Sequence, residues 1–441
     1  MSRYKPYPAY NESGVEWPGQ VPDHWAVKRL KFSLKLISEK RTCTERPVAL
    51  EHIEAWTGRL IKTDTKFEGD GICFQKSDIL FGKLRPYLAK VYLADSPGEA
   101  VGDFFVIRPN HSIYPQFAQY QLLSNAFINI VDSSTFGAKM PRASWDFLGN
   151  MSLISPPYDE QHTVATYLAH ETARIDALLE KKGRFIELLQ EKRQALITQA
   201  VTKGLDPNVK LKDSGVKWLG QVPEHWTVCH LQYVIINIEQ GWSPECHSYP
   251  AEPGQWGILK SGCVNGGVYN NNENKALPEE LSPKPQYEVK AGDILMSRAS
   301  GSPELIGSVA LVANTQDKLM LSDKIFRIQC AVKMNPAFFV NMLNSSALRS
   351  QIMHAISGAE GLANNLPQAH IKKFWVTCPP LSEQQTIVSI LDQNIARIDA
   401  LITATQRSIE LLKERRAALI TAAVTGQIDL RDSATGEGEI P

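Results

Sequence analysis

The sequence predicts an α+β protein with two mixed α/β domains in a pseudo-twofold arrangement, separated by two long antiparallel coiled-coil helices. Two repeats predict this architecture. A segment of thirteen residues occurs at 13–25 and again at 214–226, differing at only three positions. The string Arg-Ile-Asp-Ala-Leu at 174–178 returns at 397–401. Self-similarity at fixed landmarks indicates two copies of one structural unit.

The separation between the copies changes along the chain. It is 201 residues at the first repeat (214 − 13) and 223 at the second (397 − 174), so the interiors differ in length by about 22 residues. The interiors themselves barely match. We therefore expect a shared frame with a common task, and two divergent interiors that discriminate between targets.

Composition sets the broad class. With 441 residues the chain is too long for one ordinary core. Its apolar share of 43% and charged share of 21% are typical of soluble globular proteins. The 47 basic and 47 acidic residues balance, which counts mildly against a nucleic-acid binder. The balance does not exclude one, because binding depends on where the charges lie.

Cysteine usage and hydropathy predict a cytoplasmic protein. The seven cysteines include no Cys-x-x-Cys pair, so neither a zinc ribbon nor a disulfide framework is indicated, and we expect free thiols. No segment approaches the ~18 uninterrupted apolar residues of a membrane span. The first residues also lack the apolar core of a signal peptide.

Each half has the same order of segments. An opening motif rich in Gly and Pro predicts an ordered, irregular segment that tryptophans anchor to the domain: Trp17, Trp25, Trp218 and Trp226. A mixed interior follows, with strands expected at 77–81, 101–107, 292–296 and 323–328 and helices at 115–131 and 336–356.

A long helical run closes each half. It follows a proline pair, at 156–157 and at 379–380, with Asp159 and Ser382 as expected N-caps and Gly204 and Gly426 as expected ends. The predicted division is an opening segment with the first interior at 1–157, a first helical spacer at 158–204, a second opening segment with its interior at 205–380, a second spacer at 381–428, and a disordered tail at 429–441.

Both runs carry a 3.5-residue period, the pattern of a coiled coil. The first seam is Ile175, Leu179, Lys182, Ile186, Leu189, Arg193, Leu196 and Ala200; the second is Ile398, Ile402, Thr405, Ile409, Leu412, Arg416, Leu419 and Ala423. The arginines make each seam an imperfect zipper that could also receive a partner. The apolar seam residues, from Ile175 to Leu196 and from Ile398 to Leu419, are the predicted spacer and docking residues.

Together these features resemble the DNA-specificity subunit of type I restriction–modification enzymes over essentially the whole chain. The residues that carry the resemblance are Gly-Gln-Val-Pro-Asp-His-Trp at 19–25 with its copy, Pro-Pro-x-x-Glu-Gln at 156–161 and 379–384, and the helix ends at 191–197 and 414–420. Their order and duplication are specific, although no single motif is decisive.

The resemblance implies a subunit with no catalytic residue, cofactor or metal of its own. Each interior would be a target-recognition domain that reads one half of a bipartite site in double-stranded DNA. The helices would separate these domains and dock two methyltransferase (modification) subunits, which bring S-adenosylmethionine. Restriction subunits would join the full complex.

The helix length fits such a spacer. From Ile175 to Ala200 is 25 residue steps, or about 38 Å at ~1.5 Å per residue. One turn of B-DNA is about 34–36 Å, so half-sites a turn apart face the same side of a protein. The hypothesis is that the helices act as a ruler.

Base reading needs donors and acceptors on loops, with basic residues on phosphates. The best clusters supply these candidates: Lys83, Arg85, Tyr87, Lys139 and Arg142 in the first interior, and Lys260, Ser297, Arg298, Asn364, Asn365, Lys372 and Lys373 in the second. Charged residues populate every surface, so the clusters carry the prediction rather than their members.

Two other functions would explain part of this sequence. The strings Phe-Glu-Gly-Asp-Gly at 67–71 and Ser-Pro-Pro-Tyr at 155–158 imitate a stand-alone DNA amino-methyltransferase. However, no apolar strand precedes the first string, and the second half has Cys-Pro-Pro-Leu in place of the second, which favours a turn that starts a helix. A coiled-coil scaffold that does not bind DNA would leave the divergent interiors unexplained. No P-loop or His-Glu-x-x-His occurs, and His24 and His225 are expected to be buried hydrogen-bonding residues rather than catalysts.

Overall fold

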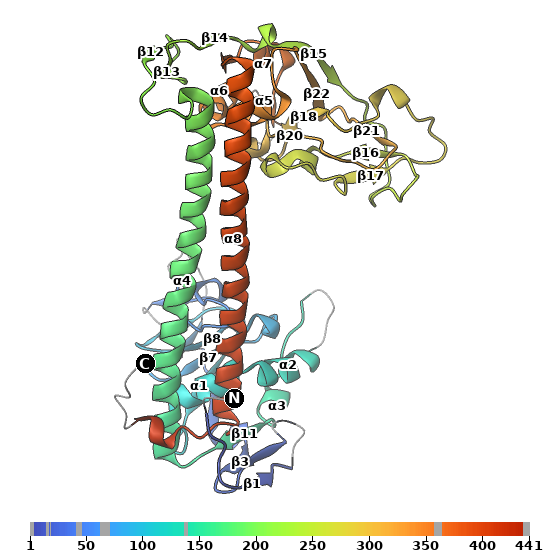
Figure 1. Ribbon diagram of the computed structural model, residues 1–441. Helices are drawn as coiled ribbons and strands as arrows, with labels where there is room; N and C mark the ends of the chain where they lie inside the picture. Colours follow the sequence, from blue (N-terminus) through green and yellow to red (C-terminus); the bar gives the residue numbers. More distant parts are fainter. Residues whose placement is uncertain are drawn as a thin grey trace. The chain divides into compact units, whose positions relative to one another are not determined.

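A computed structural model describes residues 4–14, 17, 19–40, 46–61, 71–135, 140–356 and 364–434. The chain forms two compact units: unit 1 is Met1–Gly183 with Gln406–Pro441, and unit 2 is Arg184–Thr405. The two long helices, α4 (Tyr158–Lys203) and α8 (Leu381–Val424), therefore each contribute one half to each unit (Figure 1). The boundary between the two compact units thus falls within each long helix, whereas the predicted division treats each helix as a separate segment.

Unit 1 contains two main sheets. The first is antiparallel, in the order β4-β10-β7-β8 (Leu34–Ile37, Phe104–Pro109, Ile79–Gly82, Val91–Leu93). The second has the order β5-β9-β6 (Pro47–Val48, Gly98–Ala100, Ile72–Phe74). Two ribbons pair β1 with β2 (Tyr10–Glu12, Gln20–Pro22) and β3 with β11 (Ala26–Arg29, Ser152–Ser155). The short helices are α1 (Pro115–Leu123), α2 (Asn125–Ser133) and α3 (Trp145–Leu148).

Unit 2 repeats this plan. Its sheets have the orders β15-β22-β18-β20 (Ile235–Gln240, Ile325–Cys330, Ile294–Ser297, Val309–Leu311) and β17-β16-β21 (Asn274–Ala276, Gly257–Leu259, Leu319–Met320). Its ribbons pair β12 with β13 (Leu211–Asp213, Gln221–Pro223), β14 with β24 (Thr227–His230, Trp375–Cys378) and β19 with β23 (Ala299–Ser300, Asn364–Asn365). The short helices are α5 (Pro336–Leu343), α6 (Ser346–Ala355) and α7 (Gln368–Ile371).

The α+β class and the long helices are confirmed, and the four predicted interior strands correspond to β7, β10, β18 and β22. Each predicted interior helix is instead two helices, broken at Ser124 and at Ser345. The Ser345 side chain accepts a hydrogen bond from the Leu348 backbone, which caps a new helix. A serine that can replace a helical bond with its own hydroxyl thus divides an otherwise periodic apolar run.

The opening motifs are more regular than expected. Each forms a short hairpin, β1–β2 in unit 1 and β12–β13 in unit 2, closed by a backbone hydrogen bond from Ser13 to Gly19 and from Ser214 to Gly220. Gly19 and Gly220 both have positive φ, 75° and 60°, a conformation that glycine adopts without steric cost. The prediction of an irregular segment is therefore wrong for the three strand residues inside each motif, Gln20–Pro22 and Gln221–Pro223.

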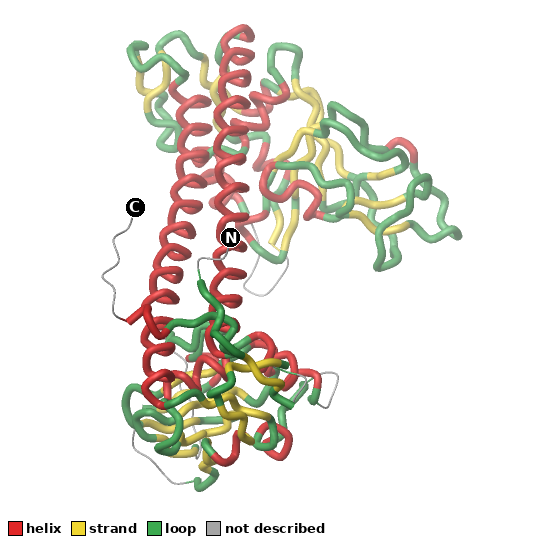
Figure 2. The backbone as a smooth tube through the Cα atoms, turned by 60° about the horizontal axis from the view of Figure 1, so that its bottom comes forward, coloured by secondary structure: helices red, strands yellow, loops and turns green. Residues whose placement is uncertain are grey.

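Both long helices start directly after their proline pair. Asp159 and Ser382 consequently lie inside the first turn, and the prediction that they are N-caps is wrong. Within each unit the two helix halves lie side by side (Figure 2). They are antiparallel, because Asp176 pairs with Arg416 in unit 1 and Arg193 pairs with Asp399 in unit 2.

The predicted seams are confirmed as the covered faces of the helices. All sixteen seam residues are buried or half-buried, whereas neighbours such as Leu178, Leu188 and Leu411 are exposed. Towards the helix ends the apolar residues join the domain cores. Val164 and Val424 pack with Phe117 in unit 1, and Ile197 and Ile387 pack with Phe338 in unit 2.

The predicted disordered tail at 429–441 is wrong for its first six residues. Leu430 is fully buried, the Asp429 backbone donates to the carbonyl of Lys5 (2.8 Å), and residues 431–434 form a 3-10 turn. This arrangement brings the two ends of the chain together within unit 1. The remainder, 435–441, lies outside the described residues.

The expectation of free thiols also needs a correction. Cys73 is disulfide-bonded. The free cysteines of the described part are Cys229, Cys246, Cys263, Cys330 and Cys378. In that same part, no helix combines the length and apolarity needed to cross a membrane.

Candidate nucleic-acid interface

The opening motif of unit 1 is held by one buried carboxylate at the start of α4. Glu160 accepts hydrogen bonds from Tyr7 Oη (2.6 Å) and Trp25 Nε1 (3.1 Å), and His24 Nε2 lies 2.9 Å from its second oxygen. Burial, followed by the hydrogen bond to Glu160, raises the pKa of Tyr7 well above its usual range. At the opposite side, a Cβ on Gly426 would lie only 2.4 Å from Pro22, so the end of α8 also presses on the motif.

Unit 2 builds the same frame. Glu383, at the start of α8, accepts from Trp226 Nε1 (3.1 Å), and His225 Nε2 lies 2.9 Å from it. Trp226 is fully buried. The predicted anchoring role of the tryptophans is confirmed, as is the hydrogen-bonding role of His24 and His225. These histidines are half-exposed rather than buried, because each side chain contacts its carboxylate from the solvent side.

The glutamine after each frame glutamate holds the interior. Gln161 accepts from the Tyr114 backbone (2.7 Å) and Gln384 from the Asn335 backbone (2.8 Å), in the turns that lead to α1 and α5. Each also donates to the carbonyl of the first proline of its pair, at 2.8 and 2.9 Å. The repeated Pro-Pro-x-x-Glu-Gln string is therefore a joint between opening motif, interior and helix. Its occurrence in both units supports the interpretation of Ser-Pro-Pro-Tyr at 155–158 as a helix start.

The seam arginines are used within the chain. Arg416 Nε lies 3.0 Å from Asp176 Oδ1, with both side chains about nine-tenths buried, and Arg416 Nη1 donates to the Trp56 carbonyl (2.9 Å). At the matching place in unit 2, Arg193 Nε lies 3.4 Å from Asp399 Oδ1, with 53% of the Asp399 side chain exposed. The expectation that the seam arginines are open to a partner is therefore wrong for Arg416.

In unit 1 the structure brings two predicted clusters into one site. The backbone of Arg85 donates to Pro141 (2.8 Å), and that of Ala143 donates to Lys83 (2.9 Å). Lys83 Nζ and Arg142 Nη2 both approach Asp103, at 3.7 and 3.0 Å. The shared carboxylate positions these two cations. The Arg85 side chain is exposed, and nearby Tyr87 is 44% exposed.

Unit 2 makes the corresponding junction. Strand β19 pairs with β23, so that Ala299 faces Asn365 and Ser300 faces Asn364. The Leu366 backbone donates to the Arg298 carbonyl (2.9 Å), as Ala143 does to Lys83 in unit 1. Arg298 Nη1 donates to the carbonyl of Asp323 (3.2 Å). The same backbone junction thus presents cations in one unit and an arginine with two amides in the other.

The remaining candidates fall elsewhere. The Ser297 side chain is 1% exposed and donates to the Leu305 carbonyl (2.6 Å), so its prediction as a DNA contact is wrong. Lys260 lies 4.0 Å from Glu273, on the turn after β16. Lys372 and Lys373 are exposed just beyond α7. Lys139 lies outside the described residues, as do 67–70 of the glycine-containing string.

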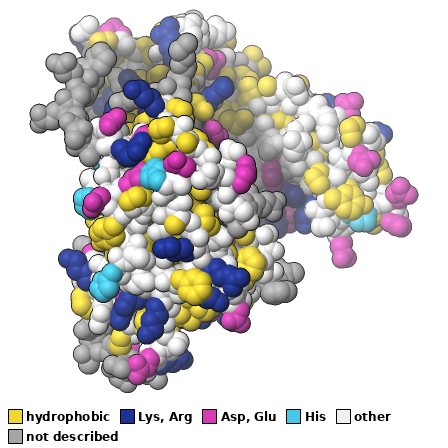
Figure 3. Space-filling view, turned by 90° about the horizontal axis from the view of Figure 1, so that it is seen from below, with side chains coloured by type: hydrophobic (Ala, Val, Ile, Leu, Met, Phe, Trp, Pro, Cys, Tyr) yellow, Lys and Arg dark blue, Asp and Glu magenta, His cyan; other side chains and the backbone are white. Residues whose placement is uncertain are grey.

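Sequence reasoning missed a basic strip beside the frame. Four cations on and after β3 are exposed, Lys28, Arg29, Lys31 and Lys35, and they flank Phe32, which is 65% exposed. Figure 3 shows Lys and Arg side chains around hydrophobic ones on the end of unit 1 that carries β1, β3 and β11. In unit 2 the matching aromatic is Tyr233, 61% exposed. The signal in the sequence was four cations within eight residues.

Other chemistry is not indicated by the described residues. Among them, no group of three or more His, Cys, Asp or Glu side chains is placed to hold a metal ion. The frame histidines face carboxylates that also accept an indole N–H, so both histidines serve the joint.

The fold and this junction define a class of duplicated, two-unit proteins, and known proteins resemble this chain in sequence and in fold. Residues 254–411 match the family model of the type I restriction modification DNA specificity domain. The match covers 158 of the 441 residues and shows that this segment is similar to that domain.

Curated relatives agree. The EcoEI specificity subunit of Escherichia coli is 29% identical over 248 residues, 56% of this chain and 41% of that protein. The EcoKI subunit of E. coli K12 is 25% identical over 73% of this chain and 68% of its own length. The MjaVIII subunit of Methanocaldococcus jannaschii is 22% identical over 94% of this chain and 95% of its own. The chain thus spans less than half of the first relative and nearly all of the third.

Solved structures share the fold. A chain from a study of assembly and conformational transition in a type I restriction–modification system has a TM-score of 0.72, with 18% identity, over 93% of this chain and 100% of that one. The HsdS subunit of Thermoanaerobacter tengcongensis has a TM-score of 0.52, with 18% identity, over 94% and 100%. The resemblance to type I specificity subunits predicted from the sequence is confirmed.

Proposed function

We propose that this chain is the DNA-recognition subunit of a type I restriction–modification complex, and that each interior reads one half of a bipartite site. One observation carries the proposal. The same backbone junction recurs on the same frame with different polar side chains, Lys83, Arg85 and Arg142 in one unit and Arg298, Asn364 and Asn365 in the other. The names of the relatives support it.

The chemistry of the junctions fits base reading in a major groove. Arginine is the usual partner of guanine and asparagine that of adenine, each through two hydrogen bonds. Our proposal gives this role to Arg85, which follows the bridge between Leu84 and Arg142, and to Asn365, which lies on β23 opposite Ala299. Lys83 and Arg142, which Asp103 holds in place, would bind phosphates and fix the register. The strip from Lys28 to Lys35 would extend these phosphate contacts.

The helices would space the two readers and dock two methyltransferase subunits along their exposed faces. S-adenosylmethionine and the transfer chemistry would reside in those partners, and restriction subunits would complete the complex in the cytoplasm. The chain itself would contribute recognition without catalysis. The paired tethers Asp176–Arg416 and Asp399–Arg193 fix the helix register that such a spacer needs.

Methylation-site mapping with single substitutions tests the assignment. Arg85→Ala is expected to relax one half-site, and Asn365→Ala the other, each at a cost of about 1–3 kcal/mol in discrimination. Each variant should leave the opposite half-site unchanged. Loss of specificity in both halves from either variant, or in neither, would contradict the proposal.

The ruler hypothesis has its own test. Insertion of four residues into both helices, at matching positions, should lengthen the unread gap between the half-sites, because each added residue extends a helix by about 1.5 Å. The map of methylated sites gives the gap directly. An unchanged gap would refute a spacer role for the helices.

A further inference from the structure

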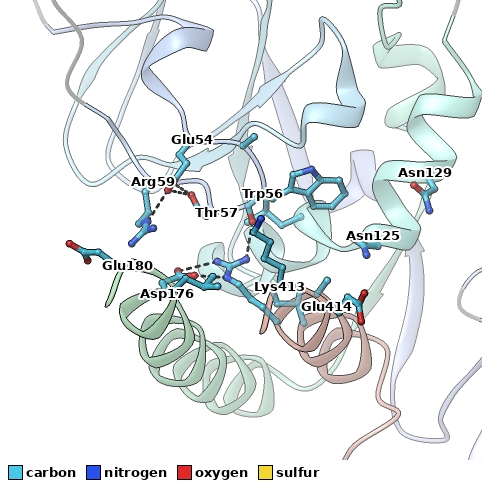
Figure 4. A pocket seen from close by; sticks show the side chains of 16 residues that line it. Glu54, Trp56, Thr57, Arg59, Asn125, Asn129, Asp176, Glu180, Lys413 and Glu414 are labelled. Carbon is cyan, nitrogen blue, oxygen red and sulfur yellow. Dashed lines mark hydrogen bonds and ion pairs between the residues drawn. The ribbon is translucent and has the colours of Figure 1, made fainter. Parts of the chain in front are cut away.

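Unit 1 contains a cavity of about 870 Å³ between the loop at 54–59 and its two helix halves. The apolar wall consists of Trp56, Leu123, Leu179, Ala417 and Ile420. Figure 4 shows the loop on one side and the helices on the other, with dashed lines that join Trp56 and Asp176 to the guanidinium between them. The cavity is therefore walled by a recognition domain and by both spacers.

Trp56 has an unusual backbone. Its φ is +65°, in the left-handed region that bulky residues rarely adopt. Two contacts hold it there, since its N–H donates to the Ala89 carbonyl (3.2 Å) and its own carbonyl accepts from Arg416 (2.9 Å). A strained backbone conformation persists only where surrounding contacts hold it, and such residues cluster at functional sites.

The second unit has glycine at the matching place. In unit 1 the Ile53 backbone donates to Leu50, and Trp56 follows three residues later. In unit 2 the Cys263 backbone donates to Lys260, and Gly266 follows three residues later, with φ of +69°. Both turns follow a strand whose partner is parallel. Unit 1 thus has Trp56 at a position of positive φ, where unit 2 has a glycine, the residue that adopts this conformation without steric cost.

The cations around the cavity all have acidic partners, whereas two of its carboxylates have no partner among the described residues. Each cation that lines it is in an ion pair: Arg59 with Glu54, Arg416 with Asp176, and Lys413 with Glu410. Glu180 and Glu414 also line it, and neither has a hydrogen bond or ion pair within the described part of the chain. The cavity thus combines an apolar wall with two carboxylates that have no partner in the described part of the chain.

The matching cavity of unit 2 differs in each respect. It measures about 350 Å³ and is lined by Gly266 and Gly267 on the loop side. Its single acid, Glu304, lies in the field of Arg349, which lines the same cavity. It therefore has no aromatic wall, and a single carboxylate lines it, where two line the Trp56 cavity outside any ion pair.

We infer that the Trp56 cavity docks a segment of one methyltransferase subunit, through a bulky apolar side chain next to a lysine or arginine. The inference rests on the proposed function. Free carboxylates beside an apolar cavity favour a basic, apolar protein segment and repel DNA phosphates. Because the cavity of unit 2 is smaller, has no aromatic wall and is lined by one carboxylate only, two copies of one partner bind the chain with unequal affinity, the tighter copy on unit 1.

Titration of the full chain with its modification subunit, followed by native mass spectrometry, tests the inference. Wild type should fill two sites in separate steps. Trp56→Gly installs the residue that unit 2 uses, so the loop can keep its backbone, and the tighter step should weaken about tenfold to thirtyfold, as loss of a central interface tryptophan does. Glu180→Lys and Glu414→Lys leave the loop untouched and should weaken the same step.

Controls separate the possible failures. Glu51→Lys, an exposed acid of unit 1 outside the cavity, should leave both steps unchanged. Two copies that bind with the same affinities in wild type and in all three variants would overturn the inference alone. It would also be overturned if the variants weakened DNA binding by the isolated chain and left partner binding intact. A wild-type chain that binds no modification subunit would overturn the proposed function as well.

Discussion

The two helix tethers occupy matching places in the repeat and have different surroundings. Asp176 and Arg416 are enclosed in unit 1, where the loop that contains Trp56 covers the arginine. In unit 2 the Asp399 side chain is 53% exposed and Arg193 is half-buried. Identical residues at identical positions of a repeat therefore differ in environment because the neighbouring interior differs. The neighbouring interior, rather than the helix, therefore determines how strongly each ion pair stabilises its unit.

The largest expected effect comes from breaking the tethers one at a time. Asp176→Ala leaves a buried guanidinium without its carboxylate and should lower the free energy of unfolding of unit 1 by about 3–5 kcal/mol. Asp399→Ala removes an exposed partner and should cost about 0–1 kcal/mol in unit 2. Hydrogen exchange of peptides from each unit measures both. Equal losses would mean that the environments do not differ as described.

A smaller difference is expected at the frame carboxylates. Glu160→Ala leaves the Tyr7 hydroxyl and the Trp25 indole without an acceptor, at a cost of about 2–3 kcal/mol. Glu383→Ala leaves only the Trp226 indole without its acceptor, and because the Glu383 side chain is 30% exposed, water can replace it, so the cost should be about 1 kcal/mol. Thermal unfolding followed by hydrogen exchange, unit by unit, gives the comparison. A greater loss at Glu383 would contradict it.

The smallest expected effect concerns the reactivity of two thiols in the β14–β24 ribbon of unit 2. Cys229 and Cys378 Sγ lie 3.4 Å apart, and the hydrogen bond from Cys378 lowers the pKa of Cys229 to about 7. Burial raises the pKa of Cys263 and of Cys330 to about 12. The rate of Cys229 alkylation should therefore reach half its maximum near pH 7 and fall as the pH falls further, because the thiolate is the nucleophile.

Mass spectrometry of iodoacetamide-treated protein identifies the labelled residue. Cys229→Ser serves as the control and should abolish the label that appears near neutral pH. A half-maximal rate near pH 8.5, the ordinary range of a cysteine, would show that the Cys378 thiol does not stabilise the Cys229 thiolate.

Sequence reasoning identified the parts of this molecule that are repeated or periodic. The duplicated motifs located the frame, and the heptad spacing identified the seam, because both are local patterns. The contact between Arg416 and the Trp56 carbonyl joins residues 360 positions apart and left no such pattern. The junction of Lys83 with Arg142 likewise required tertiary structure, because the two predicted clusters lie far apart in the sequence, and their role in DNA binding stays a prediction. The break at Ser124 was missed because apolar periodicity continues through it.

Each interior begins and ends at one place. Ala26 pairs with Ser155 on β3 and β11, and Thr227 pairs with Cys378 on β14 and β24. Some 130 or 150 residues therefore leave the frame and return to it through a single two-stranded ribbon. In genetic terms, the coding segment between these paired residues is a cassette. We expect that a replacement whose ends meet in such a ribbon keeps both long helices and the joint without further mutation.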